Sequence, residues 1–522
     1  MKKINKINIF VFVFLIFTVF NPILQMLNKV EWSDFSNIIS SSSFETALIN
    51  STIVTSVSTL ISILIAYILA FALNRTNIKR RAVLKIIITI PMLIPSISHG
   101  LGLINLFGNN GIISRIFNFN IIGFSGIVTG SILYSFPIAF LMFCDGFNYV
   151  DNNMYKASKV LGMNKWETFK HVTFCYMKKP IISAIFAVFT MIFTDYGVPL
   201  AVGGKYLTLP VYLYKEVIGL LDFSSGTIIG LFLLIPAFIS FLFDTLSKDY
   251  SNGDFENKKV MIEDNKIRDA ILTVLVYIMI ILIIAVIGSF MYYAFIDNPV
   301  LNKTLSLNHL NYVLENNIGK YIINSLLIAV LTSIIGTFIT YFAAYATART
   351  NGKISKIIHI LSISSLAIPG IVLGLSYTIT FNNSIIYNTF TILILVNIVH
   401  FMATPYLMAY NALKKLNSNF EVVAKTCNIS KFKIIKDVIV PCTKRTLREM
   451  FGYFFVNAMI TISAVAFLFN TETMPLSLLI NNYEGNMLLG EAAIVSLIIL
   501  FFNIIVKSVI YLINRKEDKK WN

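Results

Sequence analysis

Long apolar runs separated by short polar stretches fill most of this chain. A helix that crosses the hydrocarbon of a bilayer needs about 20 apolar residues, and roughly twelve runs reach that length. Because the runs are continuous and do not alternate between apolar and polar residues, they predict helices and not the strands of a membrane barrel. The expected fold is all-α, a polytopic membrane protein with about 12 transmembrane helices. These helices are predicted at residues 8–27, 47–74, 83–107, 121–144, 181–203, 225–246, 269–295, 321–348, 357–380, 387–412, 450–470 and 485–513.

The pattern occurs twice, at a constant offset. The second run opens with Ile49-Asn50-Ser51, and the eighth opens with Ile323-Asn324-Ser325, 274 residues later. A chain that contains two copies of one membrane unit is typical of transporters, whose pathway lies between the copies. A charged stretch near 248–268 joins the copies, so the predicted halves are residues 1–255 and 256–522, with six helices each. Other pairs with the same offset are Ala70 and Ala344, Ala72 and Ala346, Arg75 and Arg349, Thr76 and Thr350, Pro95 and Pro369, and Gly100 and Gly374.

Composition agrees with a membrane protein. Of the 522 residues, 56% are hydrophobic and 13% are charged, which is too much apolar surface for a soluble fold to bury. The net charge is +16, but the placement of the basic residues argues against nucleic acid as a partner. If the N-terminus is cytoplasmic, most basic residues lie on inside loops or inner helix ends. This positive-inside pattern predicts a multi-pass protein of the cell membrane with both termini in the cytoplasm. The basic residues that would lie on the outer side are Lys29, Arg115, Lys205, Lys215, Lys303 and Lys320.

Two inside loops, residues 145–180 and 413–449, are much longer than the others and occupy equivalent places in the two halves. Each is long enough for two short helices across the cytoplasmic face, with apolar residues at helical spacing. An apolar stripe on a cytoplasmic loop needs a partner to cover it, or it lies among the lipid headgroups. The stripe residues are Ala157, Val160, Leu161, Trp166, Phe169 and Val172 in the first loop, and Val423, Cys427, Phe432, Ile435 and Val438 in the second.

Within these loops, residues 156–162 and 422–428 resemble the EAA loop of ATP-binding-cassette (ABC) importer permeases. That motif reads roughly Glu-Ala-Ala, three residues, Gly, and then a hydrophobic tail that ends in Pro; the second copy reaches Pro441. The resemblance covers nearly the whole chain. It implies two homologous six-helix halves of a type I importer permease, fused into one chain.

Both loops depart from the motif. Lys156 and Val422 stand where the family has Glu, and Cys175 stands where the first copy should have Pro. Asn428 replaces the Gly, and Asn is the next residue best able to adopt a positive φ. The two matching positions make the resemblance stronger than either loop would alone.

The resemblance implies that each loop inserts into a groove on a separate ATPase subunit. Two copies of that ATPase would close on ATP, draw the loops together and rock the halves between inward-facing and outward-facing states. An extracellular binding protein would deliver the substrate. The residues expected to couple the chain to the ATPase are Ala157, Leu161, Gly162, Phe169, Ala424, Asn428, Phe432 and Pro441.

The cargo is less well defined. Fused permeases of this size occur among ferric-iron, thiamine and 2-aminoethylphosphonate importers. The stretches 193–199, 203–204 and 212–217 look most like the aminoethylphosphonate type, whereas 463–468 is similar to the iron and phosphonate members alike. The preferred prediction is therefore a phosphonate, with ferric iron, thiamine or a polyamine as alternatives.

Prolines are expected to break two of the helices. Pro91 and Pro95 interrupt the third helix, and Pro369 interrupts its copy, with Gly100 and Gly374 close by. Such breaks free backbone carbonyls and usually face protein or water. These residues are candidates to line the pathway; the alternative is close helix packing through small residues.

Acids near the membrane are the other pathway candidates. Asp195 lies near the outer end of the fifth helix, beside Tyr196 and Gly197, and Glu472 follows the eleventh helix. Asp195 could face a cationic group or an iron ion, or both acids could simply be solvated beyond the hydrocarbon. His99 has either a metal or proton role or packs among helices.

Two other classes compete with an importer permease. An ion-driven secondary transporter also has two six-helix halves, but residues 75–81 lack the Gly-Asp-Arg pattern usual between its second and third helices. A membrane-embedded enzyme would need clustered His, Asp or Glu at one face. The chain contains no GxxxxGK[ST], HExxH or GxSxG, so we expect no ATP binding, cofactor, metal or catalytic residue in this chain.

Overall fold

The computed structural model describes residues 6–109, 111–114, 120–148, 152–246, 265–298, 302–350, 352–417 and 419–521. The predicted boundary at 255/256, most of the charged stretch around it and Arg115 lie outside these residues. The division between the halves at that point stays a prediction.

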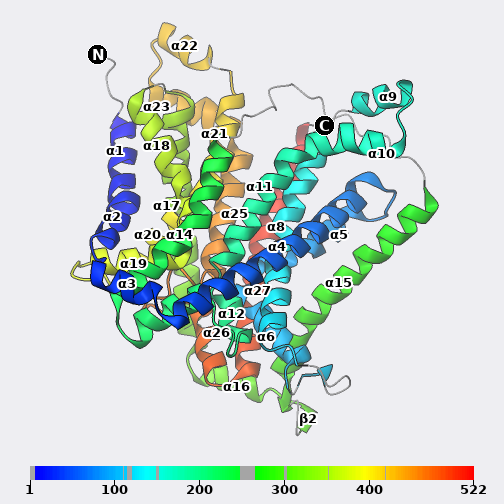
Figure 1. Ribbon diagram of the computed structural model, residues 1–522. Coiled ribbons are helices and arrows are strands. Elements are labelled where there is room, and N and C mark those ends of the chain that lie inside the picture. The colour runs from blue at the N-terminus through cyan, green and yellow to red at the C-terminus, as the bar shows by residue number, and fades with distance from the viewer. Residues whose placement is uncertain are drawn as a thin grey trace.

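Helices make up almost all of the described chain (Figure 1). In the first half they are α1 (Lys6–Leu15), α2 (Asn21–Leu27), α3 (Trp32–Ile39), α4 (Ser42–Arg75), α5 (Arg81–Thr89), α6 (Ser96–Phe107), α8 (Phe124–Asn148), α9 (Asn152–Val160), α10 (Lys165–Thr168), α11 (Phe174–Phe193), α12 (Gly197–Val202), α13 (Leu209–Tyr214) and α14 (Phe223–Leu246). In the second half they are α15 (Lys266–Phe295), α16 (Asn308–Glu315), α17 (Ile318–Ala348), α18 (Lys353–Ser364), α19 (Gly370–Phe381), α20 (Phe390–Phe401), α21 (Ala403–Lys415), α22 (Asn419–Thr426), α23 (Lys431–Ile434), α24 (Val440–Cys442), α25 (Lys444–Ile460), α26 (Leu476–Gly485) and α27 (Leu489–Trp521). The strands β1 (Ile296–Asn298) and β2 (Asn302–Leu305) form an antiparallel hairpin after α15.

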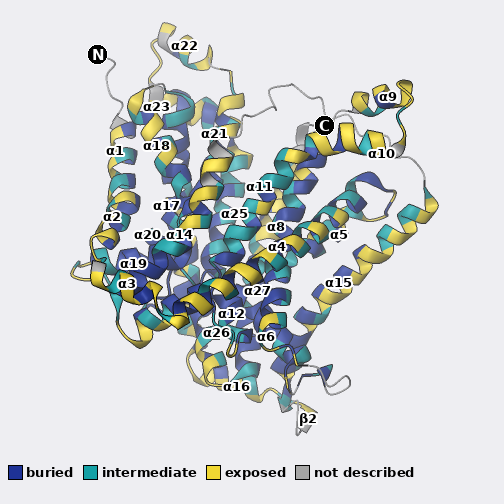
Figure 2. Cartoon of the chain, in the orientation of Figure 1, coloured by how far each residue is buried: buried dark blue, intermediate teal, exposed yellow. Residues whose placement is uncertain are grey.

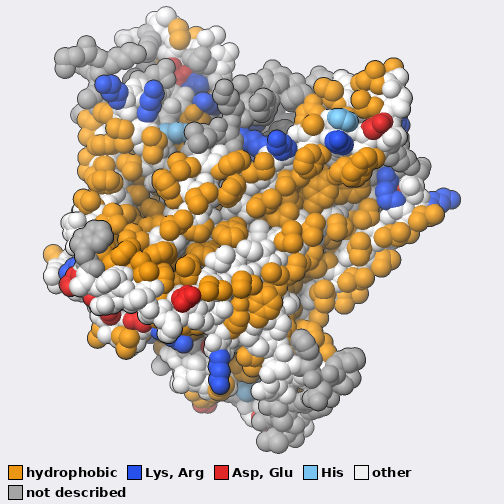
Figure 3. All heavy atoms as spheres, in the orientation of Figure 1, with side chains coloured by type: hydrophobic (Ala, Val, Ile, Leu, Met, Phe, Trp, Pro, Cys, Tyr) orange, Lys and Arg blue, Asp and Glu red, His pale blue; other side chains and the backbone are white. Residues whose placement is uncertain are grey.

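The predicted all-α polytopic fold is confirmed. Within the described residues, eight helical segments are long and apolar enough to cross a membrane, and three bent pairs raise the number to as many as 11. Helix α25 has 17 residues and matches the predicted segment 450–470 only in its first part. Exposed apolar side chains cover the middle of the molecule, as a surface facing lipid requires (Figures 2 and 3).

The helix breaks lie where the prolines are. Pro95 precedes the first turn of α6, and Pro369 occupies the same place before α19. Proline has no N–H to continue a helix and pushes the preceding residue towards extended backbone, which Ile94 and Ile368 adopt. The chain bends there by 100° and 113°. Predicted segments 83–107 and 357–380 are thus broken helices and not straight spans.

The first helix of each half packs against the other half. Helices α1 and α2 lie along α17, α18 and α19, where the Tyr377 hydroxyl donates a 2.8 Å hydrogen bond to the Thr18 carbonyl. Helix α15 lies along α4, α5 and α6. A Cβ on Gly102 of α6 would approach a Val286 methyl on α15 to 2.6 Å, so this crossing requires a glycine. The two halves therefore interlock.

Candidate functional site

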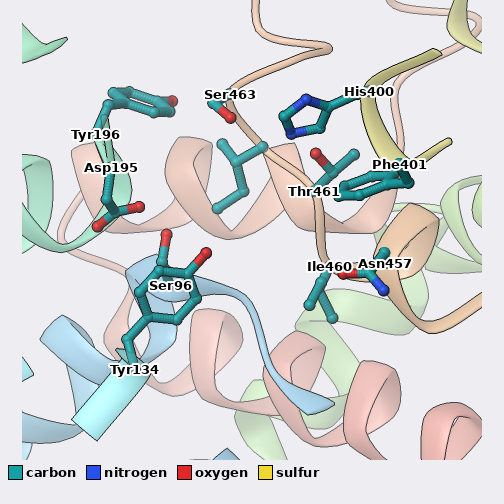
Figure 4. A pocket seen from close by; sticks show the side chains of 11 residues that line it. Ser96, Tyr134, Asp195, Tyr196, His400, Phe401, Asn457, Ile460, Thr461 and Ser463 are labelled. Carbon is teal, nitrogen blue, oxygen red and sulfur yellow. The ribbon is translucent and has the colours of Figure 1, made fainter. Parts of the chain in front are cut away.

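A cavity of about 70 Å³ lies between the halves, with room for a few water molecules (Figure 4). Four of its residues come from the first half: one at the break before α6, one in α8 and two just after α11. The remainder come from α20, α25 and the segment after α25. Its lining is Ser96, Tyr134, Asp195, Tyr196, His400, Phe401, Asn457, Ile460, Thr461, Ile462 and Ser463.

Several lining residues are internal equivalents of one another. Helices α8 and α20 begin 266 residues apart, at Phe124 and Phe390, and the same offset relates Tyr134 to His400. It also relates Asp195 to Thr461 and Tyr196 to Ile462. The offset is 274 up to the end of α6 and 266 from the start of α8, because the first half has a longer connection between α6 and α8. The cavity thus lies on the pseudo-two-fold axis, with an acid and phenols on one side and an imidazole and hydroxyls on the other.

The breaks are held by a serine packed on a glycine, in opposite order in the two halves. A Cβ on Gly197 would collide with the Ser96 hydroxyl, and a Cβ on Gly370 would collide with the Ser463 hydroxyl. Positions 96 and 370 are equivalent, as are 197 and 463. Each half therefore needs one glycine at this contact, which explains Gly197 as a close-packing position.

Asp195 is buried, with 9% of its surface exposed, and caps α12. Its carboxylate accepts hydrogen bonds from the N–H groups of Gly197 (3.3 Å) and Val198 (3.0 Å) and also bonds the Ser96 hydroxyl. No ion pair with Asp195 occurs within the described residues. A carboxylate offers about four acceptor positions, so capacity remains for a further partner.

The facing groups of the second half were not identified from the sequence. His400 turns its ring towards the cavity, and its Nδ1 has no hydrogen-bond partner in the described part of the chain. On the first side, the Tyr196 ring stacks on Tyr214 at 5.1 Å. The signal that could have found His400 is its equivalence to Tyr134, which becomes visible only once the 266-residue offset is known.

The remaining pathway candidates lie outside this lining. Gly100 packs on Ala201, and Gly374 packs on the Ala464 carbonyl, where a Cβ would come within 2.7 and 2.8 Å respectively. The Glu472 side chain is 76% exposed and pairs with Lys320 at 2.7 Å. A role of Pro95, Pro369, Gly100, Gly374 or Glu472 in the pathway stays a prediction.

The His99 side chain bonds a backbone carbonyl that the break in its helix leaves without its usual partner. Its Nε2 donates a 3.1 Å hydrogen bond to the Pro91 carbonyl. In an unbroken helix that carbonyl would accept from the N–H of residue 95, which is a proline and has none. His99 is therefore a packed structural residue. No group of three or more His, Cys, Asp or Glu gathers as metal ligands in the described segments.

The two long loops, residues 145–180 and 413–449, share one turn. Gly162 has φ +70° and Asn428 has φ +54°. The Met163 N–H bonds the Ser158 carbonyl at 3.0 Å, and the Ile429 N–H bonds the Ala424 carbonyl at 2.8 Å. Both helices thus end in the same left-handed turn, and Asn428 adopts the positive φ expected of it.

Exposure divides the loop residues into two groups. Leu161 and Phe432 are 72% and 73% exposed, and Gly162, Asn428, Ala157 and Pro441 are also on the surface. Phe169 is half-buried and stacks on Trp166 at 5.6 Å. Ala424 is 5% exposed and packs inwards. Helices α9 and α22 stand far apart on the side where α1 begins and α27 ends (Figure 1).

An arginine ties each loop to the long helix of its half. The Arg349 Nε donates to Glu421 at 2.6 Å, and its Nη1 donates to the Leu416 carbonyl at 2.7 Å. The equivalent Arg75 lies over the ring of Tyr155 at 5.2 Å and donates to the Phe147 carbonyl at 3.2 Å. Tyr155 and Glu421 are themselves 266 residues apart. The repeat revealed both arginines in the sequence, but not their partners.

Both halves of the chain match a known protein family. The family described as "Binding-protein-dependent transport system inner membrane component" matches residues 58–248 and again residues 336–519. The chain belongs to this family. It is a permease of the ABC importer type with both halves in one chain, and members of this family work with an ATPase and a substrate-binding protein.

Relatives of this permease cover most of its length. The ferric transport system permease protein FbpB of Actinobacillus pleuropneumoniae is 26% identical over 83% of the chain and 68% of the relative. A Haemophilus influenzae protein with a ferric-transport name is 26% identical over 77% of the chain and 67% of the relative. The thiamine transport system permease protein ThiP of Escherichia coli is 20% identical over 84% of the chain and 83% of the relative.

Proposed function

We propose that this permease moves ferric iron across the cell membrane, delivered by an extracellular binding protein. The observation that carries the cargo assignment is the similarity to ferric permeases over 77% and 83% of the chain. The cavity fits this cargo, because carboxylate and phenol oxygens are hard ligands that suit a hard cation. Asp195 and Tyr134 supply such groups at the seam between the halves.

A phosphonate fits less well than the sequence suggested. Among the residues that the structure describes, neither lysine nor arginine lines the cavity, and the carboxylate of Asp195 would repel an anionic phosphonate group. The relatives described above carry iron and thiamine in their names, and relatives that match about a third of the chain carry spermidine and putrescine. Thiamine is the second candidate, favoured by the relative that matches over the largest share of its own length.

The ATPase contacts are proposed at the exposed residues of α9 to α10 and of α22 to α23. Leu161, Trp166 and Phe432 are each at least 70% exposed on loops that carry several basic residues. Two ATPase copies, one on each loop, would match the pseudo-two-fold arrangement. The loops lie on the side where α1 begins and α27 ends. We therefore propose that this side and both termini face the cytoplasm.

The test is uptake of radiolabelled ferric iron, thiamine and 2-aminoethylphosphonate by cells with and without this chain. We expect loss of iron uptake alone in cells that lack it. Loss of thiamine uptake alone would move the assignment to the second candidate. Uptake that persists after ATP depletion with an intact ion gradient would favour the ion-driven class.

A further inference from the structure

We infer that the cavity between the halves is a transit site for a cationic cargo, with Asp195 as the only formal charge among its described lining residues. This inference rests on the proposed permease function and adds the binding residues and the charge selectivity. Three observations support it: the composition of the lining, the surroundings of Asp195 and the origin of the lining from both halves.

The composition of the lining favours a cation. Apart from Asp195, the polar groups are the hydroxyls of serine, threonine and tyrosine, one imidazole and one amide. A carboxylate within a membrane protein is costly unless something balances its charge. Asp195 receives two backbone N–H bonds and one hydroxyl bond, and within the described part of the chain no basic side chain lines the cavity beside it. A passing cation would supply the missing countercharge.

Helix capping alone does not account for the acid. An asparagine caps a helix about as well as an aspartate, so capping α12 does not require a negative charge. The equivalent position in the second half is the neutral Thr461, which also lines the cavity. There the chain continues as turns, without a helix like α12. Asp195→Asn removes the charge and keeps one of the two oxygens that cap α12, and a control at another helix cap measures what the loss of a capping oxygen alone does.

Asp195 also borders a second, smaller cavity of about 10 Å³ inside the first half. That volume is close to what one water molecule needs. The hydroxyls of Ser131 and Thr208 line it and are buried without hydrogen-bond partners. A water held by these hydroxyls would reach the carboxylate from behind, leaving its other face to the cavity between the halves.

The site is composed of groups from both halves. Figure 4 shows Asp195, Ser96 and Tyr134 on one side, with His400, Ser463 and Thr461 opposite them. Any movement that rocks one half against the other separates these groups. The same movement would thus dismantle the ligand set and release the cargo, as a transit site requires.

The first experiment uses purified full-length permease and terbium, a trivalent hard cation whose luminescence nearby tyrosines excite. Tyr134 and Tyr196 line the cavity beside Asp195. We expect saturable terbium luminescence in the wild type. In Asp195→Asn, which removes the charge and keeps one of the two oxygens that accept from the α12 N–H groups, we expect the affinity for terbium to fall at least tenfold. Asp222→Asn is the matched control, because Asp222 caps α14 through the Ser225 N–H at 2.9 Å and lies outside the cavity. Equal titrations of the wild type and Asp195→Asn would overturn the inference.

Uptake then separates this inference from the proposed cargo. Wild-type cells identify which labelled cation is carried, and that result alone decides between iron and thiamine. For whichever cation is carried, we expect Asp195→Asn to reduce uptake at least tenfold, with unchanged assembly with the ATPase. Normal uptake by Asp195→Asn would refute the transit site while leaving the permease assignment intact.

Discussion

Arg349, at the end of α17, holds Glu421 at the start of the second inside loop, with Nε 2.6 Å from Oε1. The arginine is almost buried, with a side chain that is 5% exposed. In the first half the equivalent Arg75 holds the Tyr155 ring instead. The two loops are thus fastened to equivalent helices, one by an ion pair and the other by a cation–π contact.

Removing this ion pair should loosen the second loop. We expect Glu421→Ala to cost about 1.5–3 kcal/mol of stability, the net value of a hydrogen bond to a charged group. If the loop couples to the ATPase as proposed, uptake of the cargo should fall several-fold, because a loosely held loop would transmit the closure of the ATPase poorly. Thermal unfolding and uptake measure the two effects. Lys320→Gln removes the exposed pair with Glu472 and should cost no more than about 1 kcal/mol. Similar losses in both variants would contradict this account.

The left-handed turn at Gly162 should tolerate asparagine and reject branched residues. Nothing lies within 4 Å of a Cβ placed there, so the cost of substitution comes from φ +70° alone. A residue other than glycine in that region costs roughly 1–3 kcal/mol, with asparagine at the low end and β-branched or bulky residues such as Val and Leu at the high end. Gly162→Asn copies the second loop and should keep near-normal uptake, whereas Gly162→Val and Gly162→Leu should lose it. ATPase co-purification and uptake are the readouts; normal uptake by Gly162→Val would argue against a strict need for this turn.

The reversed serine and glycine contacts permit an exchange test. Gly197→Ser alone sets two hydroxymethyl groups against each other and should destabilise the protein by about 1–3 kcal/mol, as overpacking does. Combining it with Ser96→Gly recreates the order found in the second half and should recover most of that loss. Thermal unfolding of the single and double variants gives the coupling energy. If the stability loss of the double variant equals the sum of the losses in Gly197→Ser and Ser96→Gly, the serine and glycine do not pack on each other as described.

The side of the molecule opposite the two long loops carries a pH-dependent contact. His309 in α16 faces Glu491 at 2.9 Å through Nδ1, and its Nε2 donates to the Ile296 carbonyl at 3.1 Å. The hydrogen bond with Glu491 is the main cause that raises the pKa of His309 above its usual value. The stabilisation is therefore complete below about pH 6.5 and is lost as pH rises through the raised pKa.

We expect the hydrogen exchange of the β1–β2 hairpin to quicken as pH rises through this range, beyond the intrinsic rate. His309→Gln should remove the excess, because glutamine does not titrate. An excess that persists in His309→Gln would show that another group causes it.

The local features of this fold follow from its residues. Pro95 and Pro369 predicted the helix breaks, because proline lacks an N–H. Asn428 could replace glycine, because asparagine tolerates a positive φ. Asp195 stood out because acids are rare in membrane segments. Each of these is a statement about one residue and its own backbone.

Features that depend on distant partners did not follow. An apolar helix such as α15 reads the same whether it packs on its own half or on the other. His400 stands alone in an apolar run, and only its place opposite Asp195 across the cavity gives it meaning. The partners of Arg75 and Arg349 lie in loops where the family motif is degenerate, so no local pattern marked Tyr155 and Glu421.

The exchange of first helices has a consequence for the order of synthesis. Thr18 leaves the ribosome 359 residues before Tyr377, and Asn8 leaves it 342 residues before Thr350. The first helix must therefore wait in the bilayer, unpaired, until most of the chain has been translated. The surface against which it packs exists only after α18 and α19 have been inserted. A chain truncated before that point would leave α1 and α2 facing lipid, a form that quality control in the membrane can recognise as unfinished.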